Sequence, residues 1–389
     1  MTKVIFKVGL ATMALFVAEV SSGRGIAQPS SSLSVRPAID GIIDAFQSRP
    51  LVAIGDDHNL AQQLDFYGVL IRDPRFAQQV GNVVLEFGGA AHQDIIDRYV
   101  AGERVPYTEL RKVWTDVAGW LPTVTGLGYI NFYANVRAAN LALPPEKRIH
   151  VWLGEPEIDW SKIKTKEDWM RVVGFRDPHA ANIVLHDILE KHKKALVIYG
   201  TGHFSAPIES MDQMQREKTA MDKRLGFDTP LQLPLQTLVE DKFPKAFFVI
   251  TPYGGFLDPK CSKAFEKNKQ SWPVPALASP VRGSALETEL QVPGCRVVPS
   301  ASATPPPGES EAEAQQIADG ADERNKGLTT DALLFFGPAE TLTRTPINPD
   351  LYLDPEYRDE VSRHNQILTG QPLGPPSSQD MSVGPRPWH

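Results

Sequence analysis

Three residues that can transfer a proton or bind a metal ion each follow a short apolar run. They are His58 after residues 51–54, Glu86 after residues 83–85 and His203 after residues 195–199. A neutral imidazole can act as a general base near neutral pH or bind a divalent ion. A carboxylate at the end of a buried run needs a cation, a histidine or a metal ion beside it, because an unpaired buried charge is costly. These residues predict a catalytic or metal-binding site, if the fold brings them together.

The apolar runs are typical of strands that are buried on both faces of a parallel sheet. Segments with helical periodicity, such as residues 60–71 and 178–194, follow the runs as in strand-helix-strand units. We therefore expect an α/β fold with a mostly parallel sheet, helices on both of its faces and a Pro-rich C-terminal extension. Ligands of such sheets bind beyond the carboxyl ends of the strands, which is where His58, Glu86 and His203 would meet.

Two Gly-x-x-His motifs, Gly55–His58 and Gly200–His203, lie on either side of the run that ends in Glu86. The pair Arg176-Asp177 precedes the helix that leads into the second motif. This combination resembles one superfamily, which groups erythromycin esterases, Tiki and TraB proteins, and ChaN-like haem-uptake proteins.

The resemblance covers residues 50–204 and a last strand at residues 331–336. It implies that Glu86 is an active-site residue. It also implies a site role for the acidic residue after the first motif glycine, which is Asp56 here and more often Glu in those proteins.

Arg176 would supply a fixed, doubly donating positive group for a carboxylate, a phosphate or a developing oxyanion. The alternative is a weak surface ion pair with Asp177 or Glu167. Asp57 is a candidate for substrate binding, but an N-cap of the helix that starts at Leu60 is the favoured interpretation.

Three further candidates for substrate binding rest on their positions after expected strands. Glu155 and Asp159 follow the run at residues 149–153, and Tyr253 follows the run at residues 246–251. Polar side chains at such positions would line the same rim as the two histidines.

Two functions remain open. The first is an exported hydrolase acting on an ester or amide bond of a small-molecule or peptide substrate. Its water would be activated by a histidine base, as the esterases imply, or by a divalent metal ion held by His58, His203 and Glu86, as the Tiki branch implies. The second is a ChaN-like protein that binds haem or iron without catalysis, for which Tyr253 or Tyr199 could be a ligand.

The composition excludes several other classes. With 389 residues, of which 42% are hydrophobic, the chain can bury a substantial core. A net charge of −7 without a basic stripe gives no support for nucleic-acid binding. The sequence has no Gly-x-Ser-x-Gly, His-Glu-x-x-His or Walker motif, which disfavours a serine hydrolase and a nucleotide-dependent enzyme.

Export is predicted from the first residues. Residues 1–27 contain two lysines, an apolar stretch and then small residues, the pattern of a cleaved signal peptide, which implies a periplasmic or secreted protein without a membrane span in its mature form. Cys261 and Cys295, which are the only cysteines, are then expected to pair.

The expected organisation has six parts. They are a signal peptide (1–27), an N-terminal segment (28–48), an α/β catalytic or binding core (49–258), a Cys-bridged insertion (259–300), a disordered linker rich in Ala, Pro, Glu and Gly (301–330), and a last strand with a C-terminal extension (331–389).

Overall fold

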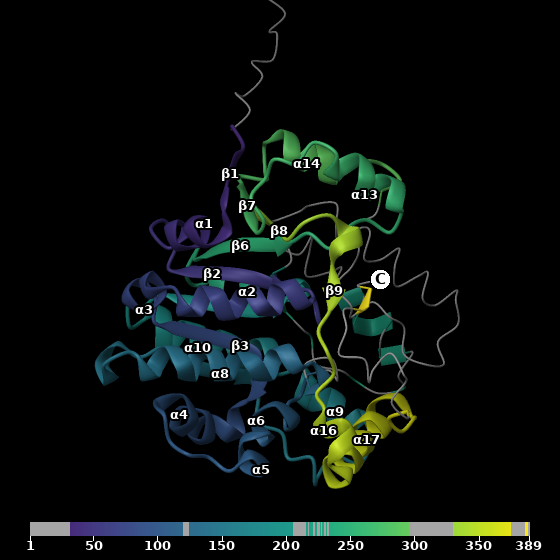
Figure 1. The fold of residues 1–389 in the computed structure, drawn as a ribbon. Helices are drawn as coiled ribbons and strands as arrows, with labels where there is room; N and C mark the ends of the chain where they lie inside the picture. Colours follow the sequence, from purple (N-terminus) through teal and green to yellow (C-terminus); the bar gives the residue numbers. More distant parts are fainter. Residues whose placement is uncertain are drawn as a thin grey trace, which may run out of the picture. The chain divides into compact units, whose positions relative to one another are not determined.

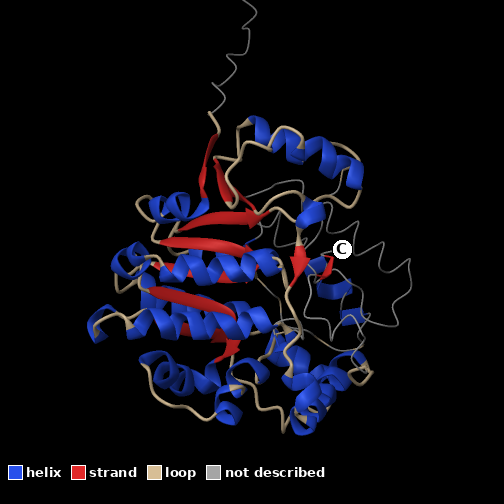
Figure 2. Cartoon of the chain, viewed as in Figure 1, coloured by secondary structure: helices blue, strands red, loops and turns tan. Residues whose placement is uncertain are grey.

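A computed structural model of the chain contains an eight-stranded sheet in the part of the sequence that it describes (Figure 1 and Figure 2). The strand order is β1-β7-β8-β6-β2-β5-β3-β4. Neighbouring strands from β8 to β4 pair in parallel, whereas β7 and β1 are antiparallel at one edge. The strands are β1 (Ser34–Pro37), β2 (Leu51–Asp56), β3 (Asn82–Gly89), β4 (His150–Glu155), β5 (Ala195–Gly200), β6 (Phe247–Pro252), β7 (Ala276–Ser279) and β8 (Ala332–Phe335). The expected α/β class with a mostly parallel sheet is confirmed.

The described residues are 32–119, 124–204, 233–295 and 330–374, with scattered residues between 215 and 231, residue 297 and residues 386–387. The expected signal peptide and, apart from Thr330, the expected linker lie outside them. None of the helices within the described residues is both long enough and apolar enough to cross a membrane.

Helices cover both faces of the sheet. Alternate residues of each strand point to opposite sides, and the apolar residues on each side pack against a layer of helices. Val52 and Ile54 of β2 belong to the apolar cluster that includes α1, α2, α4 and α8, whereas Leu51 and Ala53 belong to the cluster that includes α10 and α12. Figure 1 shows α2 and α8 in front of the strands and α10 behind them. The helices are α1 (Ala38–Ala45), α2 (Ala61–Arg72), α3 (Pro74–Gln79), α4 (Gln93–Ala101), α5 (Tyr107–Leu110), α6 (Lys112–Thr115), α8 (Leu127–Leu141), α9 (Lys166–Val173), α10 (Arg176–Ile183), which continues as a π-helical turn (Val184–Leu189), and α12 (Leu235–Glu240).

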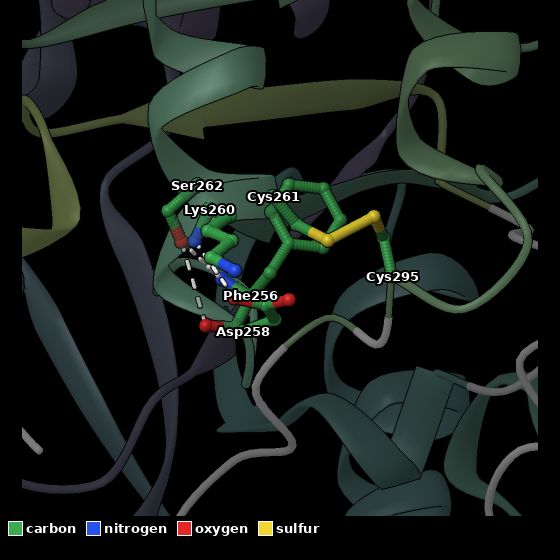
Figure 3. Close-up of a disulfide and its surroundings, with 6 residues drawn as sticks. All are labelled: Phe256, Asp258, Lys260, Cys261, Ser262 and Cys295. Atoms are coloured by element: carbon green, nitrogen blue, oxygen red, sulfur yellow. Dashed lines mark hydrogen bonds between the residues drawn. A yellow bond between two sulfur atoms is a disulfide. The ribbon is translucent and has the colours of Figure 1, made fainter.

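The segment expected as a Cys-bridged insertion carries the disulfide between Cys261 and Cys295 (Figure 3). Cys261 lies on α13 (Pro259–Glu266), near whose start the Phe256 N–H donates to Ser262 Oγ at 2.9 Å. The same segment supplies β7 to the sheet and packs α13 and α14 (Ala285–Leu290) against β7 and β8. It therefore contributes a strand as well as a bridge, which its Pro-rich composition did not indicate.

After β8 the chain returns to the turn that follows β2. Residues 341–348, called the C-terminal strap below, include β9 (Thr343–Arg344), which pairs with β10 (Arg386–Pro387). The Thr345 N–H donates to the Asn59 carbonyl at 2.8 Å, and Thr345 Oγ1 accepts the Gly128 N–H at 3.0 Å. Helices α16 (Asp350–Leu353) and α17 (Pro355–Thr369) follow. The strap thus joins the start of α2 to the start of α8.

Candidate active site

Four neighbouring strands, β2, β5, β3 and β4, place their carboxyl ends side by side. His58 follows β2, Glu86 lies on β3 where its pairing with β4 becomes irregular, Glu155 ends β4, and His203 lies in the short helix Thr201–Phe204 after β5. His203 Nε2 is 3.5 Å from Glu86 Oε1. A Cβ atom built on Gly200 would lie 3.3 Å from His58 Nε2 and 3.5 Å from Glu86 Oε2. The structure therefore brings the two histidines and Glu86 together.

Gly55, the first residue of the first Gly-x-x-His motif, is needed for close packing and not for a turn. β2 continues through Gly55 to Asp56, and a Cβ atom at Gly55 would stand 2.5 Å from Thr201 Oγ1. Only glycine lets the two Gly-x-x-His motifs approach so closely. The turn itself is made at Asn59, a non-glycine residue with a left-handed φ of 72°.

His58 is held by a buried carboxylate. Its Nδ1 lies 2.8 Å from Asp56 Oδ2, and Asp56 also accepts hydrogen bonds from Tyr129 at 2.6 Å and Tyr67 at 3.1 Å. Burial alone would lower the pKa of His58, but the hydrogen bond to Asp56 and the negative charges of Glu86 and Asp56 outweigh it, and the pKa is raised above 6.5. An acidic partner on Nδ1 is the arrangement that orients a histidine base and leaves Nε2 for chemistry.

Glu86 is the centre of the cluster. It accepts hydrogen bonds from Arg176 Nη2 at 2.5 Å and from the Gly200 N–H, and it faces His203. Burial would raise the pKa of Glu86, but the charge of Arg176, then His203 and His58, hold it well below its ordinary range. Glu86 is therefore ionised at neutral pH and holds positively charged groups at the rim.

Arg176 is partly buried and lies between two buried carboxylates, so the alternative of a surface ion pair with Asp177 or Glu167 is wrong. It donates through Nε to Glu155 Oε1 at 2.7 Å and through Nη2 to Glu86. Glu155 is fully buried, and burial raises its pKa to about 7, more than the charge of Arg176 lowers it. Gly119 leaves room for this arrangement, because a Cβ atom there would lie 2.9 Å from Arg176 Nη2.

His203 is held on its other side by Asp177. Nδ1 lies 2.6 Å from Asp177 Oδ1, which also accepts the Leu235 N–H at 2.8 Å. Burial would lower the pKa of His203, but Asp177 and Glu86 raise it to about 10. His203 is thus an imidazolium ion at neutral pH, and it cannot share the role of base with His58. Asp177 entered the sequence analysis only through the Arg-Asp pair and not as a site residue.

Three candidates do not contribute in the expected way. Asp57 is buried with a pKa raised to about 8 by burial and by Asp56, and α2 has no side-chain cap, so the N-cap interpretation is wrong. Asp159 is exposed and pairs with Ser161 and Lys162.

Tyr253 is fully buried and donates to Glu266 Oε1 at 2.7 Å. It packs among the aromatic rings beside β8 instead of at the rim, and its N–H donates to the Leu334 carbonyl of β8 at 2.8 Å.

The described residues do not form the metal site considered from the sequence, and the two tyrosines considered as haem ligands are not accessible. No group of three His, Cys, Asp or Glu side chains among them could hold a metal ion, and both oxygens of Glu86 already accept hydrogen bonds. A haem ligand must be accessible, whereas Tyr199 and Tyr253 are both fully buried.

Sequence reasoning missed the residues that support Asp56. Tyr67 and Gln63 lie four residues apart on the buried face of α2, and Gln63 joins the Gly55 carbonyl at 2.6 Å to the Asp57 N–H at 2.9 Å. Polar residues on the inner face of the helix that follows a histidine motif were a usable signal. Tyr129 gave none, because only the fold brings α8 to β2.

No protein-family model and no curated protein matches the chain. Among solved structures, it is similar to the type III effector HopBA1, with 16% identity, a TM-score of 0.33, and coverage of 58% of this chain and 87% of that one. It is also similar to a protein from Bacillus cereus, with 10% identity, a TM-score of 0.29, and coverage of 57% and 76%. Neither likeness bears on the function of this chain.

Proposed function

We propose that this protein is an exported hydrolase in which His58 activates water for attack on an ester or amide bond. The observation that carries the proposal is the buried Asp56–His58 pair, in which Asp56 holds Nδ1 while Nε2 adjoins Gly200 and Glu86. The resemblance of the Gly-x-x-His motifs to those of erythromycin esterases supports the same chemistry.

In the proposed reaction, His58 Nε2 takes a proton from water while the water oxygen bonds to the carbonyl carbon. The carbonyl oxygen becomes an oxyanion, which the positive charges of Arg176 and His203 stabilise. Their side chains are 15% and 16% exposed, compared with 5% for Glu86, so they are the charged groups best placed to meet a substrate. The protonated His58 then gives its proton to the leaving oxygen or nitrogen as the tetrahedral intermediate breaks down.

Glu86 has a supporting role in this reaction. Because it stays ionised, it cannot donate a proton at neutral pH, but it fixes Arg176, His203 and the Gly200 N–H around one point. Preorganised charges of this kind need no rearrangement as the oxyanion forms.

Export is part of the proposal because of the disulfide. A bond between Cys261 and Cys295 persists in oxidising compartments and is rare in the cytosol. Together with the leader expected at residues 1–27, it supports a periplasmic or secreted protein that acts on a small-molecule or peptide substrate.

The test compares His58→Gln with the wild type on p-nitrophenyl esters of increasing acyl length and on a p-nitroanilide peptide. Loss of the base should lower kcat by about 10³-fold. His186→Gln is the matched control, because His186 is exposed and pairs with Glu190 on its own helical turn. Retention of activity by His58→Gln within about threefold would refute the role of His58.

The same assay run across pH gives a second readout. A base must be unprotonated to act, and the pKa of His58 is raised above 6.5 by Asp56 and Glu86 against the effect of burial. We therefore expect kcat/KM to increase with pH through an apparent pKa above 6.5. An acid limb centred below 6.5 would contradict this assignment.

A further inference from the structure

A chain of hydrogen bonds runs from the backbone of Asn59 through Tyr129 and Asp56 to His58. The Asn59 N–H donates to the Tyr129 hydroxyl oxygen at 3.2 Å, and the Tyr129 hydroxyl donates to Asp56 Oδ2 at 2.6 Å. The same Oδ2 lies 2.8 Å from His58 Nδ1. We propose that Tyr129 is a positioning residue that fixes the tautomer of His58 by acting through Asp56.

The directions of these hydrogen bonds follow from the groups involved and their distances. The Asn59 N–H can only donate, so the Tyr129 oxygen accepts from it. The Tyr129 proton points to the nearest acceptor, Asp56 Oδ2 at 2.6 Å, and not to His58 Nδ1 at 3.5 Å. Tyr67 likewise directs its hydroxyl proton to the other oxygen, Oδ1, at 3.1 Å. Both oxygens of Asp56 are then acceptors, so the proton between Asp56 and His58 belongs to Nδ1. Nε2 is left unprotonated, as a base requires.

Burial of these side chains preserves the hydrogen-bond directions around Asp56. Asp56 is 2% exposed, and Tyr67 and Tyr129 are fully buried, so bulk water does not compete for the carboxylate. Hydrogen bonds to a buried carboxylate are stronger than those between neutral groups.

Tyr129 is itself fixed near the start of α8. The C-terminal strap accepts the N–H groups of Leu127 and Gly128, and the Tyr129 ring packs against Phe87 with centroids 4.9 Å apart. The hydroxyl group therefore reaches Asp56 from a rigid support. Without it, Oδ2 loses a donor, the carboxylate can rotate, and His58 can populate the Nε2–H form, which cannot accept a proton from water.

The inference rests on the proposed role of His58 as a base, but its first test does not use activity. Protein labelled with ¹⁵N in the histidine rings is examined by NMR at a pH where His58 is neutral, with His58→Gln used to assign its signals. We expect the wild type to be in the Nδ1–H form and Tyr129→Phe to show a measurable Nε2–H fraction. A His58 spectrum of Tyr129→Phe that is identical to that of the wild type would overturn the inference, whatever the activity.

Tyr133→Phe is the matched control, because Tyr133 is a fully buried neighbour on α8 whose hydroxyl donates to the Phe87 carbonyl at 2.7 Å instead of to Asp56. It should leave the His58 spectrum unchanged. If Tyr129→Phe does not fold, Tyr67→Phe replaces it and should shift the tautomer in the same direction by a smaller amount.

The second test is kinetic. Tyr129→Phe should lower kcat about tenfold and leave KM unchanged, because Tyr129 acts on His58 and not on the substrate. In an Asp56→Asn background the same substitution should cost less than about twofold, since the route through Asp56 is already lost. Equal costs in both backgrounds would overturn the inference. An altered tautomer in a protein that hydrolyses none of the substrates would instead remove the proposed function and leave the tautomer assignment standing.

Discussion

Glu155 allows a direct measurement of the electrostatics at the rim. It is fully buried, one of its oxygens accepts from Arg176, and the other has no hydrogen-bond partner among the described residues. Burial raises its pKa from 4.5 to about 7 in spite of Arg176. A shift of this size corresponds to roughly 3 kcal/mol in favour of the protonated form.

The sign of the pH dependence follows from the same shift. Between pH 4.5 and about 7, the folded protein keeps a proton on Glu155 that the unfolded chain has released. The stability that this proton contributes is fully present below pH 4.5 and is lost as the pH rises through 7. Glu155→Gln resembles the protonated form at every pH. We therefore expect the variant to match the wild type near pH 4.5 and to be more stable by up to roughly 3 kcal/mol at alkaline pH.

The measurement is urea unfolding of both proteins at several pH values, followed by tryptophan fluorescence and circular dichroism. Glu157→Gln, two residues further along and exposed, is the control and should show no such trend. A stability difference between Glu155→Gln and the wild type that does not change with pH would refute the reasoning. So would a variant that becomes less stable than the wild type as the pH rises.

Three further predictions follow. Arg176→Met leaves the buried carboxylates of Glu86 and Glu155 without their cation. It should lower the free energy of unfolding by about 3–5 kcal/mol at neutral pH. A loss below about 1 kcal/mol would contradict the ion pairs with these carboxylates. Gly200→Ala places a methyl group 3.3 Å from the nitrogen of the proposed base, which must shift, so the substitution should lower ester hydrolysis. Gly202→Ala, whose added Cβ has none of the described atoms beyond its chain neighbours within 4 Å, should retain it. Replacing Cys261 and Cys295 by serine opens a loop between residues 34 apart and should cost roughly 3–4 kcal/mol in urea unfolding, with hydrolysis retained in the folded protein.

Much of the fold could be predicted from the sequence because buried parallel strands have a distinct pattern. The runs that became β2, β3, β4 and β5 are continuous and apolar, since both faces of each strand are covered. β7 was missed because it is a short edge-side strand within a Pro-rich segment, and its place depends on pairing with β8, which lies far away in the sequence.

The site could be predicted only in part. His58, Glu86, Glu155 and His203 meet as expected, because the carboxyl ends of neighbouring parallel strands share one edge, and Arg176 joins them from the start of α10.

The sequence could not distinguish which of the two histidines carries a proton. That difference arises from tertiary contacts: His203 lies between two carboxylates and has a pKa of about 10 after their charges outweigh burial. The role of Tyr129 could not be predicted for the same reason, because no local sequence feature links α8 to Asp56.

The C-terminal strap has a consequence for biosynthesis. The turn after His58 and the helix that carries Tyr129 are tied together by residues that the ribosome adds long after both. A nascent chain that has made all eight strands of the sheet therefore still lacks the strap beside His58, and a product truncated before Thr345 should lack the proposed activity even if its sheet has formed. The proposed activity would thus appear late, once translation of the strap is complete.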